Sequence, residues 1–315
     1  MTALLEWKQK LCAFCSKNET YLIPVGKFLI AAATFLLVDT KMGYMERLSN
    51  TSILLIAALV CALLPQAAVL LLTAVLVVLH CIALSLAAGA VAFVMFFVMY
   101  LLYFRFAPQY GYNALLMTIA YTLGIPYVVP AANGLLQKPP AAIPTICGTV
   151  TYYFLKGLIA NEGSLSTKGG TKELLGKFQE IINQFTGNRE MYLSCAVFAL
   201  TALVVYTIRS LPVDYAWTIA AVTGMLVQYL AFFMGYMQIG LSNQNKQLAF
   251  GCLASIIILT VIQYFAFHLD YTRTERVQFE DDEYYYYVKA VPKQYVPAKE
   301  RKVKEISANN KKKRK

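Results

Sequence analysis

Long apolar stretches, separated by short polar ones, dominate the pattern of this chain. The longest covers residues 51–104, a run of 54 positions without a single Asp, Glu, Lys or Arg. One continuous helix over this range would be about 80 Å long at 1.5 Å per residue, against about 30 Å of hydrocarbon in a bilayer. The run must therefore fold back on itself inside a membrane, and its length predicts three segments there.

Nine stretches of the sequence are apolar enough to lie within a membrane. Several are rich in Ala, Leu and Val and lack the period of two that a membrane β-barrel requires. Helices satisfy their own backbone groups in lipid. The pattern therefore predicts an all-α polytopic transmembrane helical bundle built from Tyr21–Val38, Ser52–Leu64, Gln66–Leu84, Ala87–Phe104, Asn113–Leu136, Ala141–Ile159, Met191–Ile208, Val213–Tyr236 and Leu248–His268.

The charges at the two ends of the chain limit the number of crossings. The N-terminal segment carries Lys8, Lys10 and Lys17, and the chain ends in KKKRK. Because Lys and Arg favour the cytoplasmic side, we expect both ends in the cytoplasm and an even number of crossings, about eight. One segment then fails to cross. The two candidates are the 13-residue Ser52–Leu64 and Asn113–Leu136, which Gly and Pro interrupt.

The composition agrees with a membrane protein. The 315 residues are 58% hydrophobic and 14% charged, with a mean hydropathy of +0.54, whereas soluble domains carry about 25% charged residues. The polar start lacks the features of a cleavable signal peptide. We expect a cytoplasmic N-terminal segment (1–20), a transmembrane helical domain (21–269) and a charged, Tyr-rich cytoplasmic tail (270–315).

One polar insertion, residues 161–189, interrupts the apolar segments. Its second half predicts a helix with one apolar face, formed by Leu174, Leu175, Phe178, Ile181, Ile182 and Phe185. The other face is nearly neutral, whereas helices that bind membrane surfaces are usually basic. This favours a surface amphipathic helix packed on the protein itself or on a partner over a lipid sensor.

A proline cluster is the strongest local signal, because five of the eleven prolines lie between residues 126 and 144. Proline deletes a helical hydrogen bond and clashes with the preceding turn. Transporters use broken helices of this kind to line a substrate cavity, although a simple kink gives the same pattern. The candidates for a cavity or substrate path are Gly124, Pro126, Tyr127, Pro130 and Asn133, with Tyr121 as a companion.

Polar side chains inside the apolar segments are few. The simplest interpretation of His80 is a hydrogen-bonded interior histidine, and Gln228 and Gln263 are expected to bond across helices. The acidic residues nearest to apolar segments, such as Asp39 and Glu190, lie at segment ends. That placement argues against a carrier driven by protons or sodium through buried acids.

No catalytic or cofactor motif is present. The sequence lacks HExxH, GxxxxGK[ST] and GxSxG. Cys12 and Cys15 form a lone CxxC without the second pair or nearby His that a structural metal site needs. We therefore expect that the protein is not an enzyme and has no metal and no cofactor.

The tail has a pattern of its own. Four acidic residues, 280–283, precede Tyr284, Tyr285, Tyr286 and Tyr287. The Tyr/Val run favours an extended strand, which could add to the sheet edge of a partner. The alternative is a disordered tail held by its charges. The four tyrosines are the partner-docking candidates, and no nucleic acid is expected as a partner.

The tail phrase QFEDDEYYYYVKAVPK, placed directly after a last apolar segment, resembles that of uncharacterised multi-pass membrane proteins of clostridia-type Gram-positive bacteria. The similarity covers roughly residues 270–295. It implies a bacterial plasma-membrane protein with a cytoplasmic tail, and it implies no substrate or active site.

These patterns favour a permease-like or channel-like subunit, or the membrane anchor of a larger complex, whose tail docks a cytoplasmic protein. A purely structural membrane scaffold is the alternative, and an intramembrane enzyme is disfavoured because polar side chains are scarce inside. The expected partners are the lipid bilayer and a protein at the tail. The small residues at 85–92 leave a homo-oligomer open as well.

Overall fold

The computed structural model describes residues 2–45, 47–165, 171–266 and 274–291. Within these ranges the chain forms thirteen α-helices and one two-stranded sheet. The chain divides into two compact units. The larger unit covers Asn18–Phe267, and the smaller combines Met1–Lys17 with His268–Lys315.

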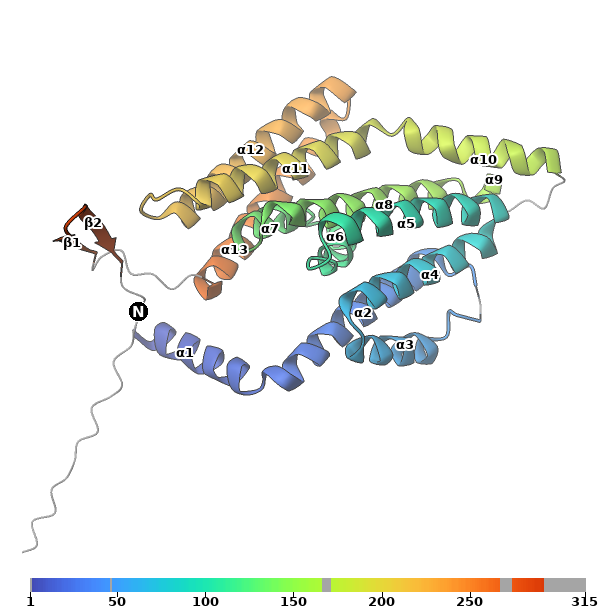
Figure 1. The fold of residues 1–315 in the computed structure, drawn as a ribbon. Coiled ribbons are helices and arrows are strands. Elements are labelled where there is room, and N and C mark those ends of the chain that lie inside the picture. Colours follow the sequence, from blue (N-terminus) through green and yellow to red (C-terminus); the bar gives the residue numbers. More distant parts are fainter. Residues whose placement is uncertain (1, 46, 166–170, 267–273, 292–315) are drawn as a thin grey trace, which may run out of the picture. The chain divides into compact units, whose positions relative to one another are not determined.

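Figure 1 shows the elements in chain order. The helices are α1 (Thr2–Lys17), α2 (Glu19–Met42), α3 (Thr51–Leu63), α4 (Gln66–Leu84), α5 (Leu86–Phe106), α6 (Tyr112–Thr122), α7 (Val128–Leu136), α8 (Ala142–Ala160), α9 (Glu162–Leu165), α10 (Thr171–Thr186), α11 (Arg189–Arg209), α12 (Ala216–Ile239) and α13 (Asn245–Ala266). Two 3₁₀ turns lie at Pro139–Ala141 and Ser242–Gln244, and the strands are β1 (Glu275–Glu280) and β2 (Tyr285–Ala290).

Six helices are long and apolar enough to cross a membrane, namely α2, α4, α5, α11, α12 and α13. The remaining predicted segments are helical as well, but α3 has only 13 residues and Asn113–Leu136 is divided into α6 and α7. The apolar run 51–104 folds into the three helices α3, α4 and α5, as its length predicts.

Side chains stabilise the two breaks within that run. At the first break, Lys27 Nζ donates a hydrogen bond to the carbonyl oxygen of Leu64 at 3.2 Å, beside Pro65. At the second, Ser85 Oγ accepts from the backbone amide of Ala88 at 3.2 Å and so caps the start of α5. Backbone groups freed by the breaks thus have partners although they lie near apolar surroundings.

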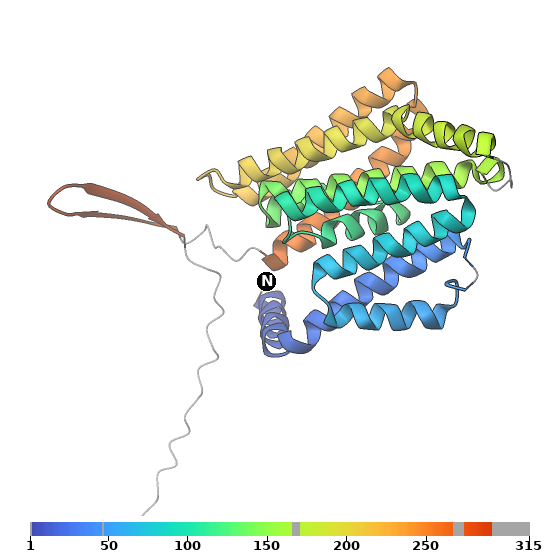
Figure 2. The same ribbon diagram turned by 45° about the vertical axis from the view of Figure 1, so that its right-hand side comes forward.

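The buried side chains of the larger unit form two separate core clusters. The first joins α2–α5 with the end of α8 and is centred on residues such as Phe35 and Leu158. The second joins α7 with α11–α13 around Phe198 and Phe232. Helix α6 contributes to both clusters. In Figure 2, α2–α4 lie on one side of α5–α8, and α11 and α12 lie on the other.

Hydrogen bonds between helix termini identify two ends of this bundle. The first end gathers the start of α2, the α3–α4 break, the end of α5 and the end of α13, through Lys27–Leu64, Gln66–Gln109 and Thr218–Gln263. The second end gathers the ends of α2 and α8 with the start of α11, through Tyr44–Glu162 and Lys156–Glu190. The larger unit therefore begins and finishes at its first end (Figure 1).

Outside the apolar helices, Tyr44 lies at the second end, where its hydroxyl donates to Glu162 Oε2 at 3.3 Å. Burial, followed by the nearby Glu162 carboxylate, raises the pKa of Tyr44 to about 12. Its hydroxyl therefore stays protonated at neutral pH and keeps its role as donor.

The insertion forms helix α10, which packs on α5 and α8. Ile181 is buried, and the ring of Phe185 contacts that of Phe154 at 5.9 Å between centroids. Gln184 Nε2 donates to the carbonyl oxygen of Gly157 at 3.2 Å. By contrast, Leu175 on the same predicted face is 69% exposed. Of the six predicted apolar positions, Ile181 is buried, Leu174 and Phe185 are half-buried, and Leu175, Phe178 and Ile182 are exposed, so the face is covered only in part.

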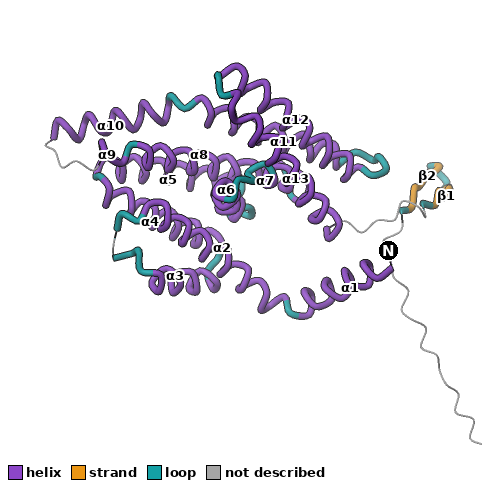
Figure 3. Tube along the Cα trace, turned by 180° about the vertical axis from the view of Figure 1, so that it is seen from behind, coloured by secondary structure: helices purple, strands orange, loops and turns teal. Residues whose placement is uncertain are grey.

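In the smaller unit, β1 and β2 form an antiparallel hairpin, which is drawn in orange in Figure 3. The larger unit is all-helical as predicted, and this hairpin is a small β element in the tail, where the sequence predicts a strand. The Tyr/Val run forms the expected strand, but that strand pairs with Glu275–Glu280 of the same chain. Register places Phe279 opposite Tyr286, and their rings stack at 5.0 Å between centroids.

The turn of the hairpin is built around Asp281. Its carboxylate accepts hydrogen bonds from the amides of Glu283 and Tyr284 and from the hydroxyl of Tyr286, at 2.7–3.0 Å. These bonds lower the pKa of Asp281, because each favours the charged carboxylate; the bond from Glu283 has the largest effect, followed by those from Tyr284 and Tyr286. From the sequence, the acidic residues 280–283 indicated only a charged segment. The structure shows that one of them, Asp281, also holds the turn together.

Candidate functional site

Helices α6 and α7 form a short hairpin within the larger unit. They have 11 and 9 residues, so each is about 14–17 Å long, half of a hydrocarbon core. At its base, Asn113 Nδ2 donates to Gln137 Oε1 at 2.7 Å and Gln137 Nε2 donates to Asn113 Oδ1 at 3.3 Å. The chain therefore enters at the first end of the bundle, turns, and returns to the same end.

The turn between the two helices lies where Gly and Pro predict a break. Gly124 has a φ of +75°, which favours glycine, and buried Pro126 follows in the connecting turn. Pro130 lies in the first turn of α7, where an amide has no partner within the helix. The predicted break is therefore confirmed at Gly124–Pro126, whereas Pro130 lies within the first turn of the second helix, which begins at Val128.

The remaining cavity candidates are packed. The ring of Tyr127 contacts Phe198 and Phe232 edge-on, at 6.4 and 5.6 Å between centroids. Gly251 of α13 approaches that ring so closely that an added Cβ would lie 2.5 Å from it. Asn133 is buried and donates to Thr145 Oγ1 at 2.6 Å. These residues hold the hairpin against α8, α11 and α13.

A cavity of about 300 Å³ lies on the other side of α6, between α2, α6 and α8. None of Gly124, Pro126, Tyr127, Pro130 and Asn133 lines it, whereas their predicted companion Tyr121 does. The other walls come from residues such as Thr118, Thr122 and Tyr152. The site to consider is thus the face of α6 that lines this cavity rather than the break between α6 and α7.

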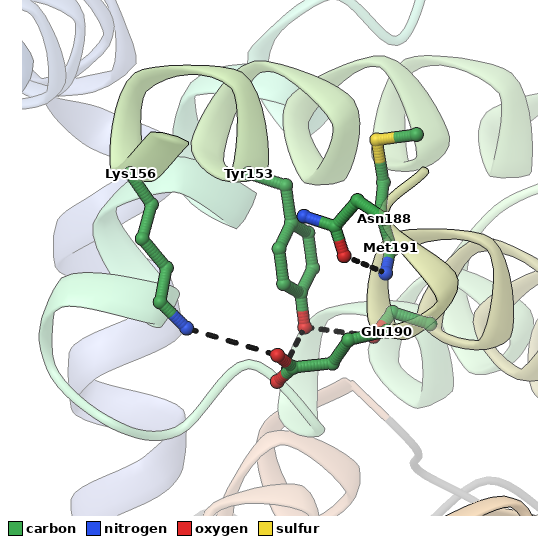
Figure 4. Close-up of polar contacts among 6 residues, drawn as sticks. Tyr153, Lys156, Asn188, Glu190 and Met191 are labelled. Atoms are coloured by element: carbon green, nitrogen blue, oxygen red, sulfur yellow. Dashed lines mark hydrogen bonds and ion pairs between the residues drawn. The ribbon is translucent and has the colours of Figure 1, made fainter. Parts of the chain in front are cut away.

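Two lysines border this cavity at the second end of the bundle, Lys41 of α2 and Lys156 of α8. Lys41 is exposed, and the side chain of Lys156 is 53% exposed. Lys156 Nζ lies 3.8 Å from Glu190 Oε2, a distance at the limit of an ion pair, as Figure 4 shows. Such exposed pairs contribute little, so the Lys156 ammonium group, which also lies 5.6 Å from the centre of the Tyr153 ring, can bind an anion.

A tyrosine cluster forms the wall behind these charges. Tyr121 of α6 stacks on Tyr152 of α8 at 4.1 Å between ring centroids. The hydroxyl of the next residue, Tyr153, lies 3.1 Å from Glu190 Oε1 and 3.0 Å from Ser194 Oγ of α11 (Figure 4). The sequence pattern did not predict this cluster. Its only local signal was the adjacent Tyr152 and Tyr153, four and three residues before Lys156.

An apolar pocket of about 80 Å³ adjoins the cavity, between α2, α4, α5, α6 and α8. Thr34, Val38, Thr118 and Leu155 line both hollows. The two adjoining hollows are together called the cleft, which is charged at the second end of the bundle and apolar toward the first.

Three polar side chains within the helices were also singled out by the sequence. Gln263 Nε2 donates to Thr218 Oγ1 of α12 at 2.6 Å, which confirms its bond across helices. His80 and Gln228 are fully buried, and their side-chain nitrogen and oxygen atoms have no hydrogen-bond partner among the described residues. The predictions of a hydrogen-bonded interior His80 and of a bond from Gln228 across helices were therefore wrong.

In the tail, the four tyrosines do not form one surface. Tyr285 and Tyr287 lie on one face of the hairpin, and Tyr286 lies on the other with Phe279, Val277 and Val288. All four tyrosines are exposed, from 37% for Tyr286 to 80% for Tyr287. The hairpin thus has one exposed apolar face, formed by Val277, Phe279, Tyr286 and Val288.

Within the part of the chain that the structure describes, no group of three or more His, Cys, Asp or Glu side chains could hold a metal ion. Comparison with protein-family models, with curated proteins and with solved structures finds no match to this chain.

Proposed function

We propose that this protein is a permease-like component of a bacterial plasma membrane, with eight crossings and α6–α7 as a re-entrant hairpin. The observation that carries the proposal is the cavity between α2, α6 and α8. This cavity lies against the α6–α7 hairpin, whose two ends lie at the same end of the bundle. Broken helices that stop at membrane depth are a recurrent element of transport proteins.

The two ends of the bundle support the proposed number of crossings. To the six long apolar helices this topology adds α3 and α8. Helix α8 has 19 residues, enough for about 28 Å, and α3 with 13 residues covers about 20 Å, which a locally thinned bilayer accommodates. Eight crossings are even in number, which agrees with both basic chain ends lying in the cytoplasm.

In this orientation the first end of the bundle is cytoplasmic and the cavity opens on the opposite side. Lys138 and Arg209 lie at the first end together with the segments that lead to the basic chain termini. The hairpin then enters from the cytoplasm and forms the inner wall beneath an outward-facing cavity.

A structural scaffold is the second candidate. It is favoured by the packing of Tyr127, Pro130 and Asn133, which makes the helix break itself a dry junction. In that case the hairpin would only join the two core clusters, and the cavity would hold no solute.

The tail hairpin is proposed to dock a cytoplasmic protein, as a membrane anchor would. Val277, Phe279, Tyr286 and Val288 form its exposed apolar face. A two-stranded hairpin is marginally stable alone, so a third strand or a covering surface would stabilise it.

The permease-like function is tested by access of water to the cavity. Thr122→Cys, in a background whose native cysteines are replaced by alanine, is expected to react with a charged, membrane-impermeant thiol reagent added from the outside. Thr201→Cys is the matched control, because Thr201 is also a helical threonine bonded to its own helix but is fully buried. If Thr122→Cys is as unreactive as the control, the scaffold is favoured instead.

A further inference from the structure

Three hollows of the larger unit adjoin one another through side chains that line two of them at once. The charged cavity meets the inner apolar pocket at Thr34, Val38, Thr118 and Leu155. The inner pocket in turn shares Ala74, Phe96 and Tyr100 with a groove of about 320 Å³ between α4 and α5. The groove lies on the outside of these two helices, where Phe93 and Phe97 are 60% and 54% exposed.

We propose that this cleft binds one anionic phospholipid of the surrounding bilayer. The headgroup phosphate lies between Lys41 and Lys156, and one acyl chain follows α8 into the inner pocket, with the groove between α4 and α5 as the opening to the bilayer. The inference rests on the proposed function, because it names the ligand class of the same cleft.

The shape and chemistry of the cleft suit an acyl chain. Its lining on α8 extends from Pro144 to Ile159, about 22 Å along the helix axis. The hydroxyls of Thr34, Thr73 and Thr118 each donate to a carbonyl of their own helix, at 2.7–3.1 Å. Because their hydroxyl donors are already used, these threonines contribute mainly their methyl groups to the lining of the cleft. A ligand segment without polar atoms, such as an acyl chain, is complementary to this lining.

The charges suit a phosphate headgroup. Lys41 and Lys156 line the same cavity, so an anion bound there would be attracted by both ammonium groups. Each ammonium group has three donors for phosphate oxygens. Glu190 Oε1 accepts a hydrogen bond from the Tyr153 hydroxyl. The distance from Glu190 Oε2 to Lys156 Nζ is 3.8 Å, which is long for an ion pair. Lys156 can therefore exchange that contact for a phosphate.

The groove between α4 and α5 distinguishes a membrane lipid from a soluble phosphate. Both helices belong to the six that are long and apolar enough to span a membrane. An opening between two such helices faces acyl chains, whereas a soluble ligand would enter only past the lysines. The occupant of the cleft is thus expected to come from the bilayer.

The test is native mass spectrometry of the full-length protein released from detergent with phosphatidylglycerol or phosphatidylcholine. One phosphatidylglycerol should be retained in preference to phosphatidylcholine. In the double variant Lys41→Gln, Lys156→Gln its affinity should fall about tenfold, since two charge-assisted contacts are lost. Lys246→Gln is the control, because Lys246 is an exposed lysine at the start of α13 that lines none of these hollows. Equal retention of the two lipids, or an equal loss in the control, overturns the proposal.

A second measurement does not depend on the folding of a variant. Phosphatidylglycerol with a photoreactive group at the end of one acyl chain should crosslink the unaltered protein at Thr73, Phe96 or Thr151. Crosslinks confined to lipid-facing positions such as Leu226 overturn the proposal, as does competition by free glycerol phosphate at the same concentration as the lipid. If Thr122→Cys is labelled in the same preparation, the water-filled cavity stands and only the ligand class is wrong. If it is not labelled, both proposals fail.

Discussion

Asn113 and Gln137, 24 residues apart in the sequence, exchange two side-chain hydrogen bonds and thereby join the start of α6 to the end of α7. The pair is partly buried, so loss of one partner leaves an amide without its bonds. We expect Asn113→Ala to destabilise the protein by about 1–2 kcal/mol. Thermal unfolding in detergent, followed by intrinsic fluorescence, measures the change.

The pair itself is isolated by a double-mutant cycle with Gln137→Ala. The two substitutions together should cost less than the sum of their separate effects, because each already removes the same bonds. Gln238→Ala is the control, as Gln238 is an exposed glutamine at the end of α12. Strict additivity of the two changes would contradict the role given to the pair.

Glycine packing between the hairpin and α8 supports a second prediction. A Cβ added at Gly148 would lie 2.5 Å from the carbonyl oxygen of Ala114 in α6, so Gly148→Ala must push the helices apart. We expect a loss of about 1–3 kcal/mol, as for other overpacked cores. Gly176→Ala in α10 meets no atom within 4 Å and should be stabilising by up to about 1 kcal/mol. Equal effects of the two substitutions would argue against close α6–α8 packing.

The buried imidazole of His80 gives a prediction of opposite sign. Its ring nitrogens have no hydrogen-bond partner among the described residues, so no hydrogen bond offsets the free energy of removing them from water. His80→Leu should therefore raise stability, by about 1 kcal/mol or more. Asn133→Leu, which removes a bond to Thr145, should lower it. A destabilised His80→Leu variant would show that the imidazole has a partner after all.

The hairpin in the tail should depend on pH through Asp281. Hydrogen bonds from Glu283, Tyr284 and Tyr286 lower its folded pKa, so their contribution to stability is present above the unfolded value of about 3.9 and is lost as the pH falls through the folded pKa. The NMR contact between the rings of Phe279 and Tyr286 should be present at pH 7 and weaken at pH 3.

Asp281→Asn should weaken the same ring contact already at pH 7, because an amide cannot accept in the same way. Asp282→Asn, one residue further along the turn, should leave it unchanged. A hairpin that persists in Asp281→Asn at both pH values would refute the role of this carboxylate.

Local pattern predicted much of the fold. The nine apolar segments are visible in the sequence because burial in lipid imposes a composition, and Gly124 and Pro126 mark the helix break because of their backbone chemistry. The sequence left two candidates for a segment that fails to cross, Ser52–Leu64 and Asn113–Leu136. The pairing of Asn113 with Gln137, which brings the two ends of the second candidate together, is a tertiary contact that no local pattern encodes.

The cleft was harder to foresee than the helices. Its walls come from α2, α4, α5, α6 and α8, so residues such as Lys41 and Lys156, 115 positions apart, meet only through tertiary packing. The proline cluster correctly predicted the helix break, but the cavity candidates chosen from it lie on the packed face of the hairpin and not on the face that lines the cavity. The strand Glu275–Glu280 was missed because its charged ends obscure the alternation of Val277 and Phe279.

The central claim is that α6–α7 enters and leaves the membrane on one side, and the sidedness of single cysteines tests it most directly. Gln109→Cys lies before α6, Lys138→Cys after α7, and Arg47→Cys at the opposite end of the bundle. In intact cells, an impermeant thiol reagent should label Arg47→Cys and spare both Gln109→Cys and Lys138→Cys until the membrane is permeabilised. Labelling of Gln109→Cys and Lys138→Cys from opposite sides would mean that the segment crosses, and would contradict the re-entrant hairpin.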